Sequence, residues 1–381
     1  MILSGFRTRP RSAWLALIGA ALALAPLAAC SAQVAAPPAE APPGAATRGL
    51  DPVLMDQAVR TAAALPRIRS LLVLRDGETL AEHRFNGGPP LDRPVNIKSA
   101  SKSVLSALVG VAIARGVIEG PDQSVLSVLK TDAPATPDPR LQQLTVAHLL
   151  SMRAGLERTS GTYYGRWVTS PNWVRYALSR PFVDEPGGNM LYSTGSTHLL
   201  SAMLTRASGR STLALAQEWL GKPLGVQIPP WPRDPQGIYF GGNDMLLSPR
   251  ALARFGELYR NGGRAGGQQV VPEAWIEESW RRRTVSSRSG NAYGYGWFIG
   301  ETAGHPVRFA WGYGGQMLYI VPDLRLTVVM TSDPYSPRER DHIGALHRLL
   351  AEAIVPAAEK GGPGPDRLST PAAARPASPR G

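Results

Sequence analysis

Residues 97–104 read Ile-Lys-Ser-Ala-Ser-Lys-Ser-Val. Apolar residues follow at positions 104, 105, 108, 111 and 112, a spacing that predicts a helix over 101–115. Ser99 then lies at the start of the helix. Lys102 lies one turn further on the same face, with its amine near the Ser99 hydroxyl. A serine followed three residues later by a lysine is typical of hydrolases that activate a serine without a histidine.

The same spacing occurs a second time, at Ser127 and Lys130. With 28 serines and five lysines in 381 residues, chance would supply about 0.4 such pairs, so spacing alone decides little. Local context favours Ser99. It lies between the extended residues 95–97 and a long helix whose first backbone N–H groups would point at an acyl-transfer site. Ser127 instead leads into the proline-rich segment 131–139, as at the end of a short surface helix.

The composition is that of a soluble globular protein with a sizeable core. Of 381 residues, 43% are hydrophobic and 18% are charged. The formal net charge is +12, and only five of the 41 basic residues are lysines. Because the arginines are spread along the chain, without a basic stripe interleaved with aromatic residues, we expect no nucleic-acid partner.

The N-terminus has the pattern of an export signal. Three arginines occur within the first eleven residues, and the apolar stretch that follows at 14–27 is too short to span a membrane comfortably. Residues 27–30 read Leu-Ala-Ala-Cys and resemble the bacterial lipobox, whose cysteine is lipidated. We therefore expect a lipoprotein signal peptide over 1–29 and a lipid anchor on Cys30 in the cell envelope. The alternative is a plain secretory peptide. Cys30 is the only cysteine, so no disulfide forms within the chain.

The folded part begins and ends with strand patterns and is helical in between. A capped helix over 51–63 precedes a hairpin that turns at Asp76-Gly77. Four apolar or alternating strands lie within 293–331, and a helix at about 338–355 follows them. The other helical patterns lie at 101–115, 145–152, 171–179, 194–208, 211–220 and 248–261. This order predicts an α/β (α+β) fold, with a mostly antiparallel sheet flanked by helices and an inserted all-helical lobe.

Composition also sets the domain boundaries. Residues 30–49 and 358–381 are rich in Ala, Pro and Gly and hold few large apolar side chains, so they predict a disordered tether and tail. The folded domain is expected over 50–357, with a cleft between its lobes. Its sheet lobe is expected over 50–115 and 265–357, and its helical lobe over 116–264.

Several stretches resemble motifs of the serine β-lactamase-like family, which includes class C β-lactamases, DD-peptidases and esterases. Residues 97–104 are similar to its first motif, and 191–195 (Leu-Tyr-Ser-Thr-Gly) are similar to its Tyr-x-Asn motif. Residues 311–316 (Trp-Gly-Tyr-Gly-Gly-Gln) occupy the place of its Lys-Thr-Gly or His-x-Gly motif. Other similar stretches are 144–156, 241–248 and 293–297. The likeness covers about 50–355 in the family's order and implies a β-lactamase-like fold.

The resemblance implies roles for residues in these motifs. Ser99 would form an acyl-enzyme, and Tyr192 with Lys102 would be the general base. Either a tyrosinate or a neutral lysine paired with tyrosine can take the serine proton. A tyrosinate requires the pKa of Tyr192 to fall below its reference of about 10, and the Lys102 ammonium would lower it. Tyr192 would then protonate the leaving group and activate water. The oxyanion hole would come from the backbone N–H groups of Ser99 and Gln316.

Two positions depart from the family's pattern. Thr194 stands where many members have asparagine, and Tyr313 stands where β-lactamases and peptidases often have a lysine that holds a substrate carboxylate. We expect both to bind substrate, and Gly314 and Gly315 to let the backbone approach it closely, although a turn or bulge would also explain these glycines. The departures favour a hydrolase of small esters or amides, including relatives of 6-aminohexanoate-dimer hydrolases.

Two alternatives remain open from the sequence. One is a β-lactamase or DD-peptidase that acts on β-lactams or cell-wall peptide, and the other is a non-catalytic module that binds a ligand in the same cleft. The sequence implies no metal or organic cofactor, since it lacks His-Glu-x-x-His and its six histidines do not cluster at metal-ligand spacing. His148 is interpreted as a capping or core residue. A Gly-x-Ser-x-Gly elbow is also absent.

Overall fold

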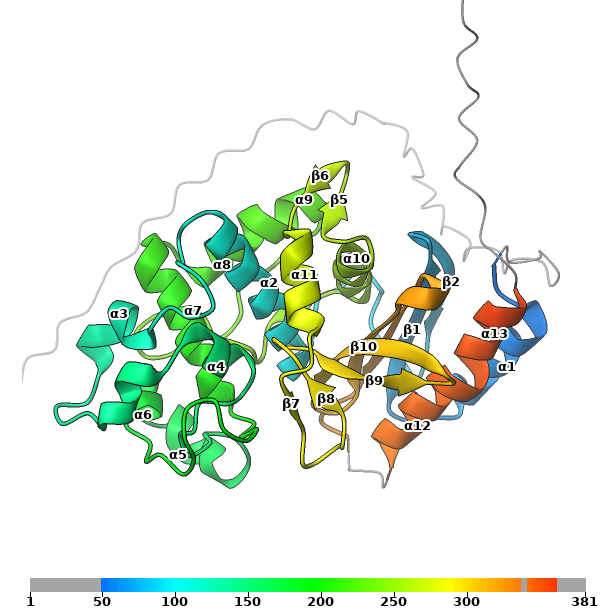
Figure 1. Cartoon of the computed structure of the whole chain (residues 1–381). Coiled ribbons are helices and arrows are strands. Elements are labelled where there is room, and N and C mark those ends of the chain that lie inside the picture. Colours follow the sequence, from blue (N-terminus) through cyan, green and yellow to red (C-terminus); the bar gives the residue numbers. More distant parts are fainter. Residues whose placement is uncertain (1–48, 337–340, 362–381) are drawn as a thin grey trace, which may run out of the picture. The chain divides into compact units, whose positions relative to one another are not determined.

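An eight-stranded antiparallel sheet forms the centre of the protein in the computed structural model, which describes residues 49–336 and 341–361 (Figure 1). The strand order is β2-β1-β12-β11-β10-β9-β8-β7. The strands are β1 (Ile68–Arg75), β2 (Glu78–Arg84), β7 (Thr284–Val285), β8 (Ala292–Tyr293), β9 (Phe298–Thr302), β10 (His305–Gly312), β11 (Gln316–Val321) and β12 (Leu326–Ser332). Because β1 pairs with β12, the first and last strands of the chain lie side by side, as the strand patterns predict.

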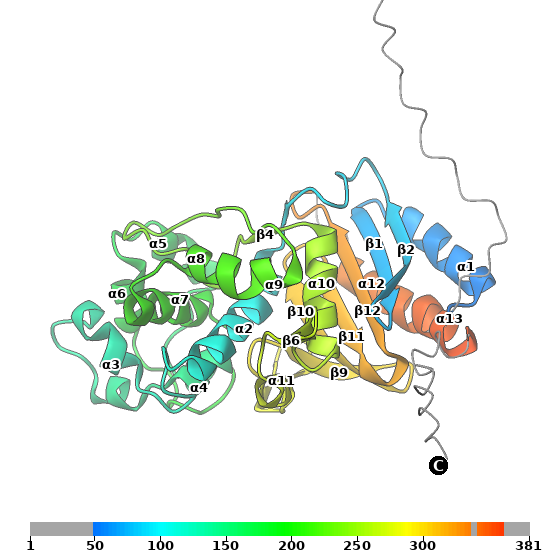
Figure 2. The ribbon, with the colours of Figure 1, turned by 90° about the horizontal axis from the view of Figure 1, so that it is seen from above.

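Helices cover both faces of this sheet. On one face lie α1 (Pro52–Ala63), α12 (His342–Leu349) and α13 (Val355–Lys360), and on the other lie α2 (Ser101–Ala114) and α10 (Pro249–Arg260) (Figures 1 and 2). Every residue of the central strands β11 and β12 is buried. These strands are therefore nearly continuous apolar runs, because both of their faces pack against helices.

The remaining helices form the helical lobe around α7 (Thr194–Ser208), whose first eleven residues are buried. The others are α3 (Val125–Leu129), α4 (Val146–Leu150), α5 (Tyr164–Val168), α6 (Trp173–Leu178), α8 (Thr212–Ala216) and α9 (Lys222–Leu224). His148 and Thr145 form a capping box at the start of α4, so the prediction of a capping role for His148 is confirmed. None of the helices in the described ranges is long and apolar enough to cross a membrane.

Two short two-stranded sheets and one helix complete the described fold. β3 (Val95–Asn96) pairs with β4 (Leu246–Leu247), and β5 (Arg264–Ala265) pairs with β6 (Gln268–Gln269). α11 (Glu273–Trp280) packs on α2 through Trp275, whose indole N–H donates to the Ser106 carbonyl at 2.9 Å. The β3–β4 pair joins the chain just before Ser99 to a segment that lies far along the sequence.

The structure differs from the predicted boundaries in two places. Helix α10 was expected in the helical lobe, but its apolar side packs on β12, β11 and β1, so that lobe ends before it. The folded chain also continues past 357 to the end of α13 at Lys360. The Arg75 side chain holds this end by donating to the Ala358 carbonyl at 2.7 Å. The predicted signal peptide, Cys30 and most of the predicted tether and tail lie outside the described residues.

Candidate active site

Ser99 lies in a single turn, Lys98–Ala100, that leads directly into α2. Lys98 has a φ of +51°, which is a strained conformation for a residue with a side chain. The Asn96 side chain supports this turn by accepting from the Lys98 N–H at 2.9 Å. The β3–β4 pair fixes Asn96 itself. Ser99 is therefore held at the beginning of a central helix, as the sequence predicts.

Lys102 is 2% exposed, and its amine makes three polar contacts. The Nζ atom lies 3.2 Å from the Ser99 Oγ, 3.3 Å from the Thr194 Oγ1 and 2.6 Å from the Gly242 carbonyl oxygen. A neutral amine has two N–H groups and one lone pair. If the N–H groups go to Gly242 and Thr194, the lone pair faces the Ser99 hydroxyl. The structure thus brings the predicted serine and lysine together in a geometry suited to proton transfer.

Burial changes the proton affinity of Lys102. Loss of solvent lowers the pKa of the amine from 10.5 to about 7, and the negative charge of Asp244 opposes that change only in part. A group that titrates near neutral pH is present as a free base in a large fraction of molecules. In those molecules the Lys102 amine is already neutral at physiological pH. It can therefore accept a proton without first being deprotonated by another group.

Tyr192 lies beside Lys102, but its pKa shifts in the opposite direction to the one expected. The Lys102 Nζ lies 5.1 Å from the centre of the Tyr192 ring. Burial raises the pKa of Tyr192 to about 12, and its hydrogen bond with Ser99 offsets this only partly. The expectation of a lysine ammonium that lowers the tyrosine pKa is therefore wrong. Since burial disfavours both charges, Tyr192 stays neutral near pH 7 and a large fraction of Lys102 is neutral as well, which corresponds to the second of the two forms considered above.

Gly242 supplies an acceptor for Lys102 that sequence reasoning missed. Its φ is +73°, and a Cβ there would lie 2.7 Å from the Lys102 Cγ and 2.4 Å from the Thr197 Oγ1. Only glycine fits this position without displacing the lysine. The signal was present in the family-like stretch 241–248. The pattern gave no reason to connect a carbonyl there with an amine 140 residues earlier.

Thr194 contacts the Lys102 amine through its hydroxyl. Its side chain is 5% exposed, and its hydroxyl contacts both Lys102 and the Ser160 Oγ, the latter at 3.1 Å. Ser160 also accepts from the Thr194 backbone N–H at 2.9 Å and so fixes the first turn of α7. The expected role of Thr194 in substrate binding stays a prediction, and the structure adds that its hydroxyl contacts Lys102 and Ser160.

The turn between β10 and β11 carries the other predicted residues. Gly314 and Gly315 have φ values of +81° and +101°, and Cβ atoms there would collide with Pro334 and with the Ser332 and His342 side chains. Both glycines are thus required by the turn and its packing, which is the alternative considered for them above. Tyr313 is 51% exposed at the tip of the same turn.

Gln316 begins β11 with a buried side chain, whose amide donates to the Ser332 carbonyl at 2.6 Å. Its backbone role in an oxyanion hole stays a prediction.

The end of β10 lies directly against the turn that contains Ser99. A Cβ on Gly312 would lie 2.2 Å from the Ile97 carbonyl oxygen and 3.2 Å from the Ala100 nitrogen. The backbone that follows Gly312 is therefore a second candidate for the donor opposite Ser99.

A polar network beside Ser99 was also missed by sequence reasoning. The Asp244 Oδ1 accepts from the Asn96 side chain at 2.7 Å and from the Lys98 Nζ at 2.9 Å. Lys98 also donates to the hydroxyl of Tyr335, at 3.2 Å. Although burial works against it, bonding to Asp244 and Tyr335 raises the pKa of Lys98. Lys98 is thus a charged residue beside Ser99, and Lys102 is the residue that titrates near neutral pH.

The other serine–lysine pair forms no site. Ser127 is exposed in α3, and its hydroxyl donates to the Ser124 carbonyl at 2.7 Å.

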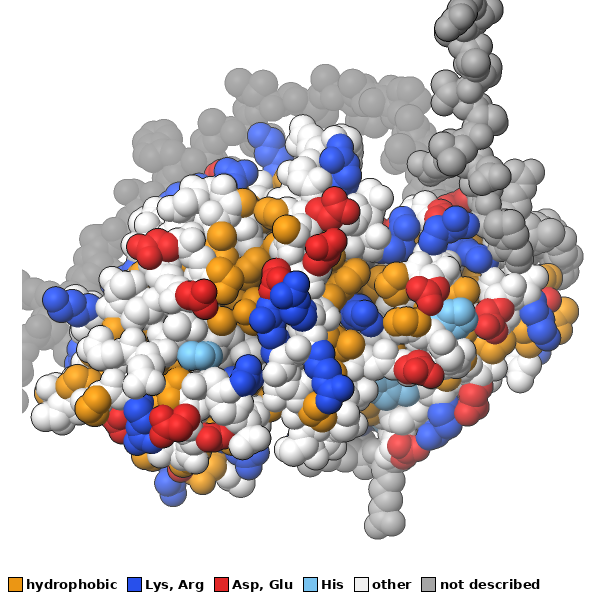
Figure 3. All heavy atoms as spheres, viewed as in Figure 1, with side chains coloured by type: hydrophobic (Ala, Val, Ile, Leu, Met, Phe, Trp, Pro, Cys, Tyr) orange, Lys and Arg blue, Asp and Glu red, His pale blue; other side chains and the backbone are white. Residues whose placement is uncertain are grey.

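Within residues 49–336 and 341–361, no group of three His, Cys, Asp or Glu side chains is placed to hold a metal ion. On the face shown in Figure 3, Lys and Arg side chains are interspersed with Asp and Glu side chains.

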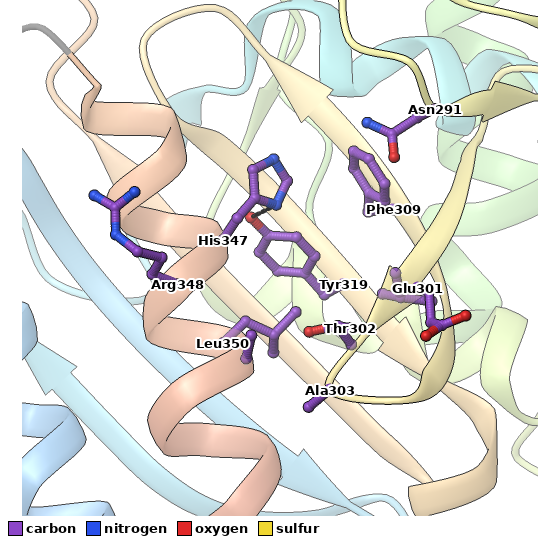
Figure 4. A pocket seen from close by; sticks show the side chains of 11 residues that line it. Asn291, Glu301, Thr302, Ala303, Phe309, Tyr319, His347, Arg348 and Leu350 are labelled. Atoms are coloured by element: carbon purple, nitrogen blue, oxygen red, sulfur yellow. Dashed lines mark hydrogen bonds between the residues drawn. The ribbon is translucent and has the colours of Figure 1, made fainter.

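A cavity of about 330 Å³ lies on the opposite face of the sheet from Ser99, between β9, β10 and α12 (Figure 4). Phe309, Tyr319 and His347 line it, and the Tyr319 hydroxyl lies 3.2 Å from the His347 Nδ1. Burial lowers the pKa of His347. The cavity shares no lining residue with the Ser99 site, so its size carries no argument for the chemistry there.

Comparison with known proteins agrees with the fold. Residues 54–352 match the model of the family described as beta-lactamase. The chain is 25% identical over 310 residues to a 6-aminohexanoate-dimer hydrolase of Paenarthrobacter ureafaciens, covering 74% of this chain and 77% of that protein. Among solved structures it is similar to an octameric penicillin-binding protein homologue from Pyrococcus abyssi, with a TM-score of 0.62, 19% identity, and 81% and 78% of the two chains covered. It is also similar to EstCE1, a hydrolase with promiscuous acyltransferase activity, with a TM-score of 0.62, 17% identity, and 80% and 97% covered.

Proposed function

Since the chain belongs to the beta-lactamase family, whose members act on small amide, ester or β-lactam substrates, we propose that it is a serine hydrolase that works through an acyl-enzyme on Ser99. The observation that carries this proposal is the contact between the Ser99 Oγ and the Lys102 Nζ at 3.2 Å. Lys102 is buried, with its pKa lowered to about 7. A serine hydroxyl needs a base within hydrogen-bond reach, and this lysine meets the requirement in distance and in proton affinity.

The acylation step follows from these protonation states. Lys102 takes the proton of the Ser99 hydroxyl while the oxygen attacks the substrate carbonyl. Tyr192, protonated at rest, gives its proton to the leaving group as the bond to the carbonyl carbon breaks, and Lys102 then reprotonates it. Acylation thereby moves one proton from serine to leaving group, and it ends with Lys102 and Tyr192 both neutral again. In deacylation a water molecule delivers its proton along the same path in reverse, and Ser99 regains its hydrogen.

Charge that develops on the carbonyl oxygen requires two N–H donors. We propose that the Ser99 N–H is one of them. The second would come from the backbone at the β10–β11 turn, either from Gln316 or from Tyr313, which follows Gly312. The close approach of Gly312 to the nucleophile turn favours Tyr313.

We propose small esters and amides as substrates rather than β-lactams or cell-wall peptide. The turn that follows β10 presents an exposed Tyr313 where the related β-lactamase and peptidase motif carries a lysine. Lys98, the charged lysine beside the nucleophile, is already paired with Asp244 at 2.9 Å. A substrate carboxylate would have to compete with Asp244 for Lys98, at the cost of that ion pair. The similarity to the 6-aminohexanoate-dimer hydrolase of Paenarthrobacter ureafaciens supports amides as substrates.

A fluorophosphonate probe and a small substrate panel test this proposal. We expect the probe to label Ser99, as mapped by peptide mass spectrometry, and a short-chain nitrophenyl ester to be hydrolysed with repeated turnover. A chromogenic cephalosporin should be turned over much more slowly than the ester. Labelling without turnover would favour the ligand-binding alternative. Turnover of the cephalosporin alone would favour a β-lactamase, and absence of labelling would refute a nucleophilic Ser99.

We further propose that the mature protein is anchored in the cell envelope by a lipid on Cys30. The support is the stretch Leu-Ala-Ala-Cys at 27–30, after a basic and then an apolar segment. In a bacterial host, the full-length protein should appear in the membrane fraction, and Cys30→Ser should shift it to the soluble exported fraction. Equal distribution of the two proteins would contradict the anchor.

A further inference from the structure

A buried histidine–aspartate pair lies one helical turn from the residues that hold Lys102. His198, in α7, is 0% exposed, and Asp234 is 5% exposed. The His198 Nε2 lies 3.0 Å from the Asp234 Oδ2. The other Asp234 oxygen accepts the backbone N–H groups of Gln236 and Ile238, at 2.9 and 2.8 Å. Trp167, Trp173 and Phe240 surround the imidazole.

The partners of His198 fix which ring nitrogen carries the hydrogen. The Gly241 backbone N–H points at the His198 Nδ1 across 3.3 Å, and a backbone N–H can only donate. The Nδ1 atom must therefore be unprotonated. The hydrogen then lies on Nε2 and is donated to the carboxylate of Asp234. Asp234 thus sets the tautomer that allows His198 to accept from Gly241.

The loop that His198 holds is the loop that supplies the acceptor for Lys102. Gly241 and Gly242 are adjacent, and the Gly242 carbonyl accepts from the Lys102 Nζ at 2.6 Å. Two other side chains of α7 hold the same loop. The Thr197 Oγ1 lies 3.0 Å from the Gly241 carbonyl, and the Ser201 Oγ lies 2.7 Å from the Tyr239 carbonyl. Of these anchors, only His198 depends on a buried carboxylate for its hydrogen-bonding direction.

We propose that Asp234 and His198 are positioning residues for the Ser99 site. Through Gly241 they hold the loop whose next carbonyl binds the Lys102 amine and whose backbone covers its side chain. This inference rests on the proposed function of Lys102 as the base. The pair acts through the backbone, since it accepts hydrogen bonds from the N–H groups of Gly241, Gln236 and Ile238.

Asp234→Asn tests the tautomer directly, because it keeps the shape of the side chain and removes the charge. The N–H₂ group of the substituted amide would donate to the His198 Nε2, so the ring hydrogen would move to Nδ1 and face the Gly241 N–H. Two opposed donors should push the 241–242 loop away from Lys102. We expect kcat/KM for the nitrophenyl ester to fall about 10- to 100-fold, the usual cost of losing a residue that orients a functional group.

The pKa of Lys102 gives a readout that a loss of stability would not imitate. The loop shields the amine, so loosening it should admit water and raise the pKa of Lys102 from about 7 toward 10.5. Tyr192 and Asp244 also face this amine, and neither is changed in the variant. The chain has only five lysines, so ¹³C-lysine NMR can follow this titration without turnover. We expect its midpoint in Asp234→Asn to rise by about one unit or more, a difference of ~1.4 kcal/mol.

Two further variants complete the design. His198→Asn places an amide oxygen where the Nδ1 lies and keeps an acceptor for Gly241, so it should retain more activity than His198→Leu. His347→Asn removes another imidazole that is hydrogen-bonded through Nδ1, on the opposite face of the sheet, and should leave the Lys102 titration at its wild-type midpoint. If Asp234→Asn fails to fold, the comparison of His198→Asn with His198→Leu carries the test.

The outcomes separate this inference from the proposed function. A folded Asp234→Asn with wild-type kcat/KM and an unmoved Lys102 titration overturns the positioning role. So does equal behaviour of the two His198 variants. If the wild-type protein neither labels nor turns over, the hydrolase proposal fails. The NMR titration still decides whether Asp234 positions Lys102.

Discussion

Ser99→Ala is expected to lower kcat/KM for the nitrophenyl ester by about 10⁴-fold or more, because the variant lacks the hydroxyl that lies beside the Lys102 amine and that forms the acyl-enzyme in the proposed mechanism. At 1.36 kcal/mol for each factor of ten, this is a loss of ~5 kcal/mol in transition-state stabilisation. Steady-state kinetics should show the loss, and intact-protein mass spectrometry should show no adduct with the fluorophosphonate.

Ser127→Ala is the matched control, since Ser127 has the same spacing to a lysine but is exposed in α3. It should react and turn over like the wild-type protein. Thermal melting of both variants should stay close to that of the wild type, because neither substitution opens a cavity larger than one oxygen atom. Ester hydrolysis by Ser99→Ala at close to the wild-type rate would rule out the acyl-enzyme mechanism.

Lys102→Met is expected to lower kcat/KM by about 10³-fold, within the range that a general base contributes. Methionine keeps most of the buried chain length and removes the amine that lies 3.2 Å from the Ser99 Oγ. In the wild-type protein, activity should rise with pH through an apparent pKa near 7, as Lys102 becomes neutral. The variant should lose this limb of the profile together with the activity.

Stability measurements separate the loss of the base from a folding defect. Burial lowers the pKa of Lys102 to about 7 in the folded protein, against 10.5 when solvated, so between these values the unfolded chain binds more protons. Wild-type stability should therefore gain a contribution that increases from pH 7 to 10.5, and Lys102→Met should lack it. Near neutral pH the variant should be at least as stable as the wild type. Lys130→Met, at an exposed lysine, should match the wild type in activity and in the pH dependence of its stability.

The periodicity of the sequence predicted the main elements well, because they are long and strongly patterned. The helices at 51–63 and 194–208 were predicted within one residue of α1 and α7, and the strands that pair across β1 and β12 were recognised by their apolar runs. The strand expected at 293–299 is less regular. It is divided between β8 and β9, because Gly294 and Gly296 turn the chain against the Ser279 and Lys102 carbonyls.

The candidate site combines residues that are close in the sequence with residues that are far apart in it. Ser99 and Lys102 are three residues apart, so a helix alone brings them together, and the sequence sufficed to find them. The two residues that accept from the Lys102 amine, Thr194 and Gly242, lie 92 and 140 residues after Lys102 in the sequence. A motif suggests that such residues are near one another, but it does not show which atom faces which.

The spacing of residues within one segment was enough to predict the Ser99–Lys102 pair, its helix and the family of folds. The proton affinities of Lys102 and Tyr192, in contrast, follow from the folded arrangement, because they depend on how much solvent reaches each group. Burial lowers the pKa of Lys102, which the backbone at Gly242 covers, to about 7, and burial raises the pKa of Tyr192 to about 12. In the proposed mechanism the neutral lysine, rather than a tyrosinate, is consequently the base for the Ser99 hydroxyl.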